Sequence, residues 1–296
     1  MSVVEAHSVD SEISQTADSP GADARPSRLR RLAGRAASLP VLVVAFVVVT
    51  VLASGPLREL DKLLDFQWIR WYAPSLRPFF QEVLDRIAGQ AVVLPVLAAV
   101  AIPLAWRRRS WRPILAGFAA EVGFLGVIGL MKIGFARPAP QLNDPSFFQG
   151  GLFSQGWHGI SYPSGHAAES VIFYGLAVCL IAKYSSASRR LVTLLGFCAA
   201  LITLNAVFTS FVLGWHWVTD LVGGVVAGGV VLRIIVRAEA ALPDRFLPVG
   251  RPLLPVSRAR EVRAARQLPV AASWVSRRTH GGDVTEADSP RARLRH

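Results

Sequence analysis

Long apolar runs constrain this chain more than any other feature of its sequence. A helix crosses the hydrocarbon core of a bilayer with about 20 apolar residues, at about 1.5 Å of rise per residue. Six runs come close to that length, at residues 40–57, 87–106, 113–131, 164–183, 191–213 and 215–236. We therefore predict an all-α fold, a bundle of six transmembrane helices over residues 40–236.

The composition favours a membrane protein over several other classes. Of the 296 residues 52% are hydrophobic, and the mean hydropathy of +0.40 is too high for an ordinary soluble domain. The net charge is +12, but the arginines gather in the tails and in short turns between apolar runs, which favours a membrane face over nucleic acid as the partner. Cys179 and Cys198 lie inside apolar runs, so we expect no disulfide framework and no metal site. No cofactor is expected, and the oligomeric state cannot be read from these features.

The distribution of basic residues predicts which parts of the chain share a side of the membrane. Residues 1–39 and 237–296 are rich in arginine and lack apolar periodicity, so we predict two disordered basic tails. Basic residues also gather in the turns at 107–112 and 183–190. Six crossings place these turns and both tails on one side, which the positive-inside rule makes cytoplasmic. The loop at 132–163 then faces outward.

The segment between the first two apolar runs has a mixed character. Residues 58–87 combine Trp68, Trp71 and Tyr72 with several charged side chains. Tryptophan and tyrosine are enriched where a membrane meets water. We predict that this segment is an amphipathic helix lying at the membrane interface.

One candidate site lies where the outward loop meets the fourth apolar run. Pro163 precedes the run, Ser164 can cap the helix, and Gly165 lets an oxyanion approach the free N–H groups of the first turn. His166 adds a titratable donor there. A helix start of this kind suits a phosphate group. The alternative is a capped membrane helix that happens to carry a histidine at the interface.

Two further polar clusters lie on the same side. His216 and Asp220 are four residues apart and share a helix face, so the carboxylate can orient the imidazole. The flanking tryptophans could simply form an aromatic belt at the membrane interface. An aromatic belt does not explain why Asp220, a costly charge, lies one turn into an apolar helix. The other cluster supplies two cations, Lys132 and Arg137. Lys132 could instead simply extend its charge towards the interface.

Together these groups suit one kind of chemistry. Two histidines, two cations and a helix start without a metal-ligand set suit metal-free phosphoryl transfer through a phosphohistidine. The cations and backbone N–H groups would hold the phosphoryl oxygens, one histidine would attack, and the other would protonate the leaving oxygen.

The order of these motifs resembles the type-2 phosphatidic acid phosphatase family, which includes lipid phosphate and polyprenyl-diphosphate phosphatases and shares its site with vanadium haloperoxidases. The motifs are Lys132 followed by Arg137-Pro138, then Pro163-Ser164-Gly165-His166, then Gly-x-His-Trp-x-x-Asp ending at Asp220. The resemblance implies that His216 is the nucleophile, Asp220 its orienting group and His166 the general acid. It also implies a phosphate site formed by Lys132, Arg137, Ser164 and Gly165.

Two positions depart from the family's pattern. The usual first motif is Lys-x6-Arg-Pro, but here Ala139 stands seven residues after the lysine and Arg137 falls at five. The third motif usually begins with Ser-Arg, where this chain has Thr209 and Ser210. We expect Arg137 to replace the arginine of the first motif, and nothing replaces that of the third.

The sequence thus predicts a membrane phosphatase that acts on a lipid phosphate, such as a polyprenyl diphosphate or phosphatidic acid, at the outer face. Three alternatives stay open. The protein could pass the phosphoryl group to an acceptor other than water, bind phospholipid without catalysis, or be a small transporter, for which Glu121 inside the third run is the hint.

The predicted sidedness can be tested by labelling. Single cysteines at Gln149 and Ser186, introduced in a background without Cys179 and Cys198, lie in the outward loop and in a basic turn. An impermeant thiol reagent should label only the first variant in intact cells, and both after the cells are lysed. Labelling of the Ser186→Cys variant alone in intact cells would invert the topology.

Overall fold

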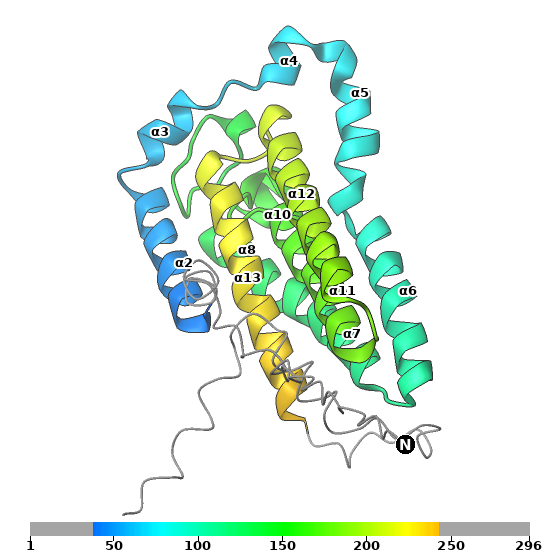
Figure 1. Ribbon diagram of the computed structural model, residues 1–296. Helices are drawn as coiled ribbons and strands as arrows, with labels where there is room; N and C mark the ends of the chain where they lie inside the picture. Colours follow the sequence, from blue (N-terminus) through cyan, green and yellow to red (C-terminus); the bar gives the residue numbers. More distant parts are fainter. Residues whose placement is uncertain (1–37, 243–296) are drawn as a thin grey trace, which may run out of the picture.

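The computed structural model describes residues 38–242, and helices make up most of this part of the chain (Figure 1). No β-strand occurs among these residues, which confirms the predicted all-α class. The predicted tails lie largely outside the described range, at residues 1–37 and 243–296. The helices are α2 (Leu39–Ser54), α3 (Arg58–Leu63), α4 (Trp68–Tyr72), α5 (Arg77–Phe79), α6 (Gln90–Arg108), α7 (Arg112–Gly123), α8 (Gly129–Phe135), α9 (Leu152–Gln155), α10 (Gly165–Glu169), α11 (Gly175–Tyr184), α12 (Arg189–Val212) and α13 (Val218–Ala241).

The helical stretches fit a six-crossing bundle. Five are long and apolar enough to span a membrane, and α2 with α3–α4 forms a sixth candidate that bends by 73° after Ser54. Short π-helical turns join α7 to α8 and α10 to α11, so each of these pairs continues as one rod. This number of candidate spans, five or six, agrees with the predicted bundle of six membrane helices.

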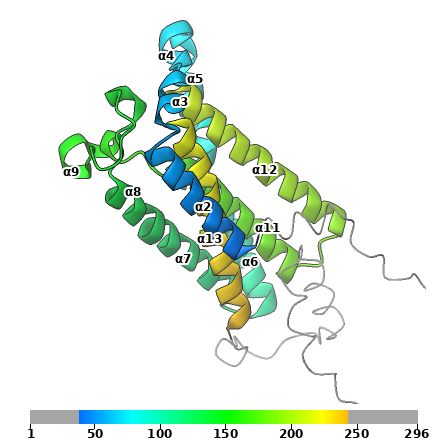
Figure 2. The same ribbon diagram turned by 90° about the vertical axis from the view of Figure 1, so that its left-hand side faces the viewer.

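Helix α13 is the central element of the bundle. It packs against α2, α7 and α10. Figures 1 and 2 both show α2 running alongside it. Small residues allow this close approach. A Cβ atom at Gly224 would lie 2.5 Å from the carbonyl oxygen of Ser164, and one at Gly228 would lie 2.9 Å from that of Ala168. The backbone of α10 therefore lies directly on α13.

Apolar side chains sort into an interior and a lipid-facing surface. The interior cluster joins α6, α7, α10, α11 and α13, with Leu97, Ile128, Ile172, Phe173 and Leu176 among its buried members. Other large apolar side chains point outward from the bundle: Phe118 is 66% exposed, Leu130 69% and Leu204 62%. Exposure on this scale is costly in water and favourable in lipid.

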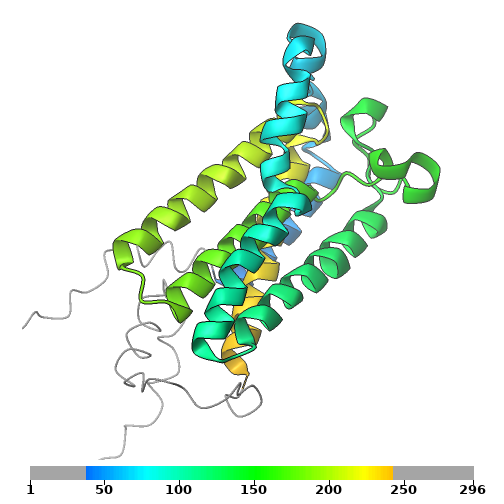
Figure 3. The same cartoon turned by 90° about the vertical axis from the view of Figure 1, so that its right-hand side faces the viewer.

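Two boundaries differ from the sequence-based expectation. Residues 58–87 do not form one interfacial helix: they fold into short helices, and the second crossing already begins in this segment, at Pro74–Arg108 (Figure 3, cyan to teal). Helix α13 also continues beyond Val236 to Ala241, because Ala238, Ala240 and Ala241 favour helix and the buried Glu239 pairs with Lys183.

The loop between α8 and α10 folds back on itself beyond the ends of the membrane helices (Figure 2). Three backbone hydrogen bonds hold it, from Gly150 N to Ala136 O, from Ala139 N to His158 O, and from Ser161 N to Arg137 O, each 2.7 Å long. The loop thus brings Arg137 close to the residues that precede α10. Both lie at the end of the bundle where α13 begins.

Candidate active site

The predicted site residues gather at that end of the bundle. Lys132 lies in α8, Arg137 in the loop after it, His166 in α10, His216 in the turn before α13, and Asp220 in the first turn of α13. Backbone contacts join these elements directly, since Ser164 N donates to Asp220 O over 2.9 Å. Motifs far apart in the sequence are therefore brought together.

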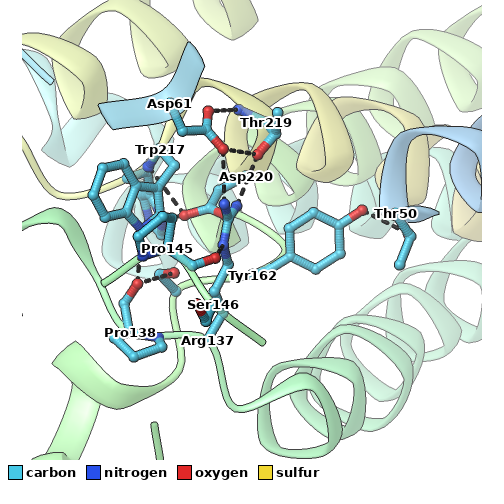
Figure 4. Close-up of polar contacts among 12 residues, drawn as sticks. Thr50, Asp61, Arg137, Pro138, Pro145, Ser146, Tyr162, Trp217, Thr219 and Asp220 are labelled. Carbon is cyan, nitrogen blue, oxygen red and sulfur yellow. Dashed lines mark hydrogen bonds and ion pairs between the residues drawn. The ribbon is translucent and has the colours of Figure 1, made fainter. Parts of the chain in front are cut away.

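A buried ion network forms the base of the site (Figure 4). The side chain of Arg137 is 0% exposed and lies between two carboxylates, with Nη2 2.7 Å from Asp61 Oδ2 and Nη1 2.5 Å from Asp220 Oδ1. Its Nε donates to Pro145 O and its Nη1 also donates to Thr219 Oγ1. Asp61 in turn accepts from the backbone N–H and the hydroxyl of Thr219. One cation thus ties α3, the loop and α13 together.

These partners change the interpretation of Arg137. The sequence placed it among the phosphate ligands, but its guanidinium is directed at Asp61 and Asp220 and is closed off from solvent. A cation held between two carboxylates has little positive charge left for a third anion. Contact between Arg137 and phosphate stays a prediction that this geometry does not support.

Asp220 orients the imidazole of His216. One carboxylate oxygen, Oδ1, is held by Arg137, while Oδ2 accepts from Trp217 N at 3.0 Å and lies 3.6 Å from His216 Nδ1. The latter distance is longer than that of a hydrogen bond, so the carboxylate lies beside Nδ1 without bonding to it. Because Nδ1 faces the carboxylate, Nε2 is the nitrogen left to react. Burial lowers the pKa of His216, and Asp220 opposes this shift, so the ring is neutral and nucleophilic at neutral pH.

His166 also has a carboxylate partner, which the sequence did not predict. Its Nε2 lies 3.2 Å from Asp85 Oδ2, and Asp85 comes from the segment before α6. The ring centroid of His166 lies 6.5 Å from that of Trp215, next to His216 in the chain. Both histidines of the site are therefore paired with an aspartate.

The predicted phosphate-binding groups lie beside the histidines. A Cβ atom at Gly165 would come within 3.5 Å of Lys132 Cε, so these two residues are in contact. Lys132 Nζ donates to the carbonyl oxygens of Ile160 and Ser161, at 3.1 and 3.4 Å. Its charge has carbonyl rather than carboxylate partners, which leaves it available to an anion.

Ser164 precedes α10 as predicted, but its hydroxyl does not cap the helix. Its Oγ is buried and has no hydrogen-bond partner within residues 38–242. A buried hydroxyl without a partner is costly, and an oxyanion would satisfy it. This observation favours the predicted phosphate role of Ser164.

The positions that depart from the family pattern all lie inside the protein. Ala139, Thr209 and Ser210 are buried, and Ser210 Oγ has no hydrogen-bond partner in the described part of the chain. Over residues 38–242, no three His, Cys, Asp or Glu side chains are grouped so as to hold a metal ion.

Asp61 and Asp85 are the functional residues that sequence reasoning missed. Both are buried, although both belong to the segment interpreted as an interfacial helix. Neither lies at a recognisable spacing from its partner in the sequence. The available signal was slight: each acid directly follows a leucine, in Leu60-Asp61 and Leu84-Asp85, and is followed by a basic residue.

The comparisons with known proteins agree with the motifs and the fold. Residues 113–243 match the family profile of the PAP2 superfamily. The crystal structure of a transmembrane PAP2-type phosphatidylglycerolphosphate phosphatase from Bacillus subtilis superposes with a TM-score of 0.56 at 17% sequence identity, covering 69% of this chain and 97% of that one. No curated protein sequence matches significantly.

The role of Arg137 can be tested through stability. Arg137→Ala should destabilise the substrate-free protein by about 3–5 kcal/mol, because it leaves the buried carboxylates of Asp61 and Asp220 without a cation. Thermal unfolding in detergent measures this effect. The control is Arg58→Ala, which removes a partly buried arginine that contacts Ser146 of the same loop. Equal thermal stability of the two variants, with activity lost only in Arg137→Ala, would restore the phosphate-ligand interpretation.

Proposed function

We propose that this chain, which matches the PAP2 superfamily over residues 113–243, is an integral membrane phosphatase that hydrolyses a lipid phosphate without a metal ion. The observation that carries the proposal is the pairing of His216 with Asp220 beside Lys132, Gly165 and His166. These are the groups that a phosphohistidine mechanism requires. The fold alone would support many activities.

The first chemical step forms a covalent intermediate. The lone pair of His216 Nε2 attacks phosphorus while the bond from phosphorus to the leaving oxygen breaks. His166 gives its proton to that oxygen, which departs as an alcohol or as a phosphate. Asp220 stays ionised and stabilises the positive charge that develops on the His216 ring.

The second step returns the enzyme to its starting state. His166, now neutral, accepts a proton from water as the water oxygen attacks the phosphoryl group on His216. The bond between phosphorus and Nε2 breaks, and inorganic phosphate leaves. Lys132, the hydroxyl of Ser164 and the backbone N–H groups at Gly165 would hold the non-bridging oxygens through both steps.

The proposed substrate is a lipid because of where the site lies. The site is at the end of a bundle whose outer helices α2, α7, α8 and α12 expose large apolar side chains, so a headgroup can enter while its tails stay in the bilayer. Phosphatidic acid, phosphatidylglycerol phosphate and a polyprenyl diphosphate all fit this description. The charge distribution favours an outward-facing site and cytoplasmic termini.

Phosphate release is the direct test of this function. Purified full-length protein in detergent with EDTA should release phosphate from at least one of three substrates: phosphatidic acid, phosphatidylglycerol phosphate and a polyprenyl diphosphate. His216→Ala should abolish release, and Lys132→Ala should lower kcat/KM roughly 100-fold, as for loss of a charged transition-state contact.

The matched control is His158→Ala, since His158 is an exposed histidine of the outer loop and lies outside the proposed site. Its activity should equal that of the wild type. Binding of the substrates without release would favour the non-catalytic alternative, and release that depends on an added alcohol acceptor would favour a phosphotransferase. Loss of activity in EDTA, restored by a divalent metal, would contradict the proposed mechanism.

A further inference from the structure

Asp85 faces the histidine that the proposed mechanism uses as general acid. Its Oδ2 lies 3.2 Å from His166 Nε2, a distance within reach of a charge-assisted hydrogen bond. Asp85 is buried, and its other oxygen has no hydrogen-bond partner within the described residues 38–242. A buried carboxylate is costly unless it is paired with a charge. The pair is therefore most favourable when His166 carries its proton.

The backbone around Asp85 is irregular in a way that directs this side chain inward. A π-helical turn at Phe80–Leu84 and a 3₁₀ turn at Arg86–Ala88 flank Asp85, and the extended Gly89 then starts α6. A regular helix running into α6 would place this residue on a different face. The segment thus departs from regular geometry at the residue that contacts His166.

Two polar side chains from the bundle hold this irregular segment in place. Asn205 of α12 donates to Leu84 O over 2.9 Å, and Tyr174 donates through its hydroxyl to Ile87 O over 2.6 Å. These carbonyls stand on either side of Asp85. Tyr174 lies in the same membrane rod as His166, so the rod that carries the histidine also fixes the position of its partner.

Four charged or titratable groups surround the His166 ring. Asp85 and Glu169 are opposite in charge to a protonated ring and Lys132 is of like charge, while His216 is neutral. Among these, Asp85 is the group that forms an ion pair with the ring, over 3.2 Å. His166 would otherwise face a lysine without a direct counter-charge.

We propose that Asp85 is a positioning residue that holds His166 as a protonated, correctly oriented general acid. Because Nε2–H is directed at Asp85, the proton for the leaving oxygen comes from Nδ1. This inference rests on the proposed function and adds a second His–Asp pair to it. Asp220 then orients the nucleophile, His216, and Asp85 orients the general acid, His166.

The test compares two substrates whose leaving groups need a proton to different extents. Asp85→Asn should lower kcat for phosphatidic acid roughly 100-fold, within the range for general acid catalysis, because its alkoxide leaving group must be protonated. The same variant should lower the pre-steady-state rate of nitrophenolate release from p-nitrophenyl phosphate, which reports the first step alone, less than about threefold, since nitrophenolate leaves without a proton. Combining Asp85→Asn with His166→Ala should cost no more than His166→Ala alone.

The control is Glu82→Gln, an exposed acid in the same irregular segment, which should leave both rates unchanged. Equal losses on both substrates, additive losses in the double variant, or a gain of activity in Asp85→Asn would each overturn the inference. A gain would mean that the carboxylate obstructs the phosphate site. If the wild type releases phosphate from none of the three lipid phosphates, the proposed function fails and this inference fails with it.

Discussion

The arrangement of the site depends on one buried cation. Arg137 lies between Asp61 and Asp220, and through them it joins the segment after the first membrane helix to the start of α13. Neither carboxylate would be stable in this interior without it, because an uncompensated buried charge costs several kcal/mol. The orientation of Asp220, and hence of His216, is set by this network. An arginine that the family pattern would place against phosphate thus serves here to fix the group that orients the nucleophile.

The two histidines differ in the nitrogen that faces a carboxylate. His216 presents Nδ1 to Asp220 and keeps Nε2 for attack, while His166 presents Nε2 to Asp85. Burial lowers the pKa of His216 and keeps it neutral, as a nucleophile must be. Lys132 supplies a cation whose partners are carbonyl oxygens. The chain also lacks the third-motif arginine, so the balance of charge at the site is less positive than the family pattern would give.

The sequence predicted the parts of the protein that depend on local pattern. The apolar runs predicted the all-α bundle. The sequence also predicted the pairing of His216 with Asp220, but not its geometry: His216 lies in the turn before α13, so the two residues do not share a helix face as expected. The sequence could not predict contacts across the fold. Asp61 and Asp85 meet their partners only after the segment at 58–87 bends over the end of the bundle, and the partners of Arg137 depend on the path of a long loop. Interior pairs of this kind leave no periodic signal in one chain.

The central claim is that His216 carries the phosphoryl group during turnover. Full-length protein should be mixed with p-nitrophenyl phosphate labelled in the phosphoryl group, quenched without acid, digested and analysed by mass spectrometry. The account predicts label on His216, with more accumulating in His166→Ala, because loss of the base that activates water slows the second step. Label on His166, or turnover without any phosphohistidine, would contradict it.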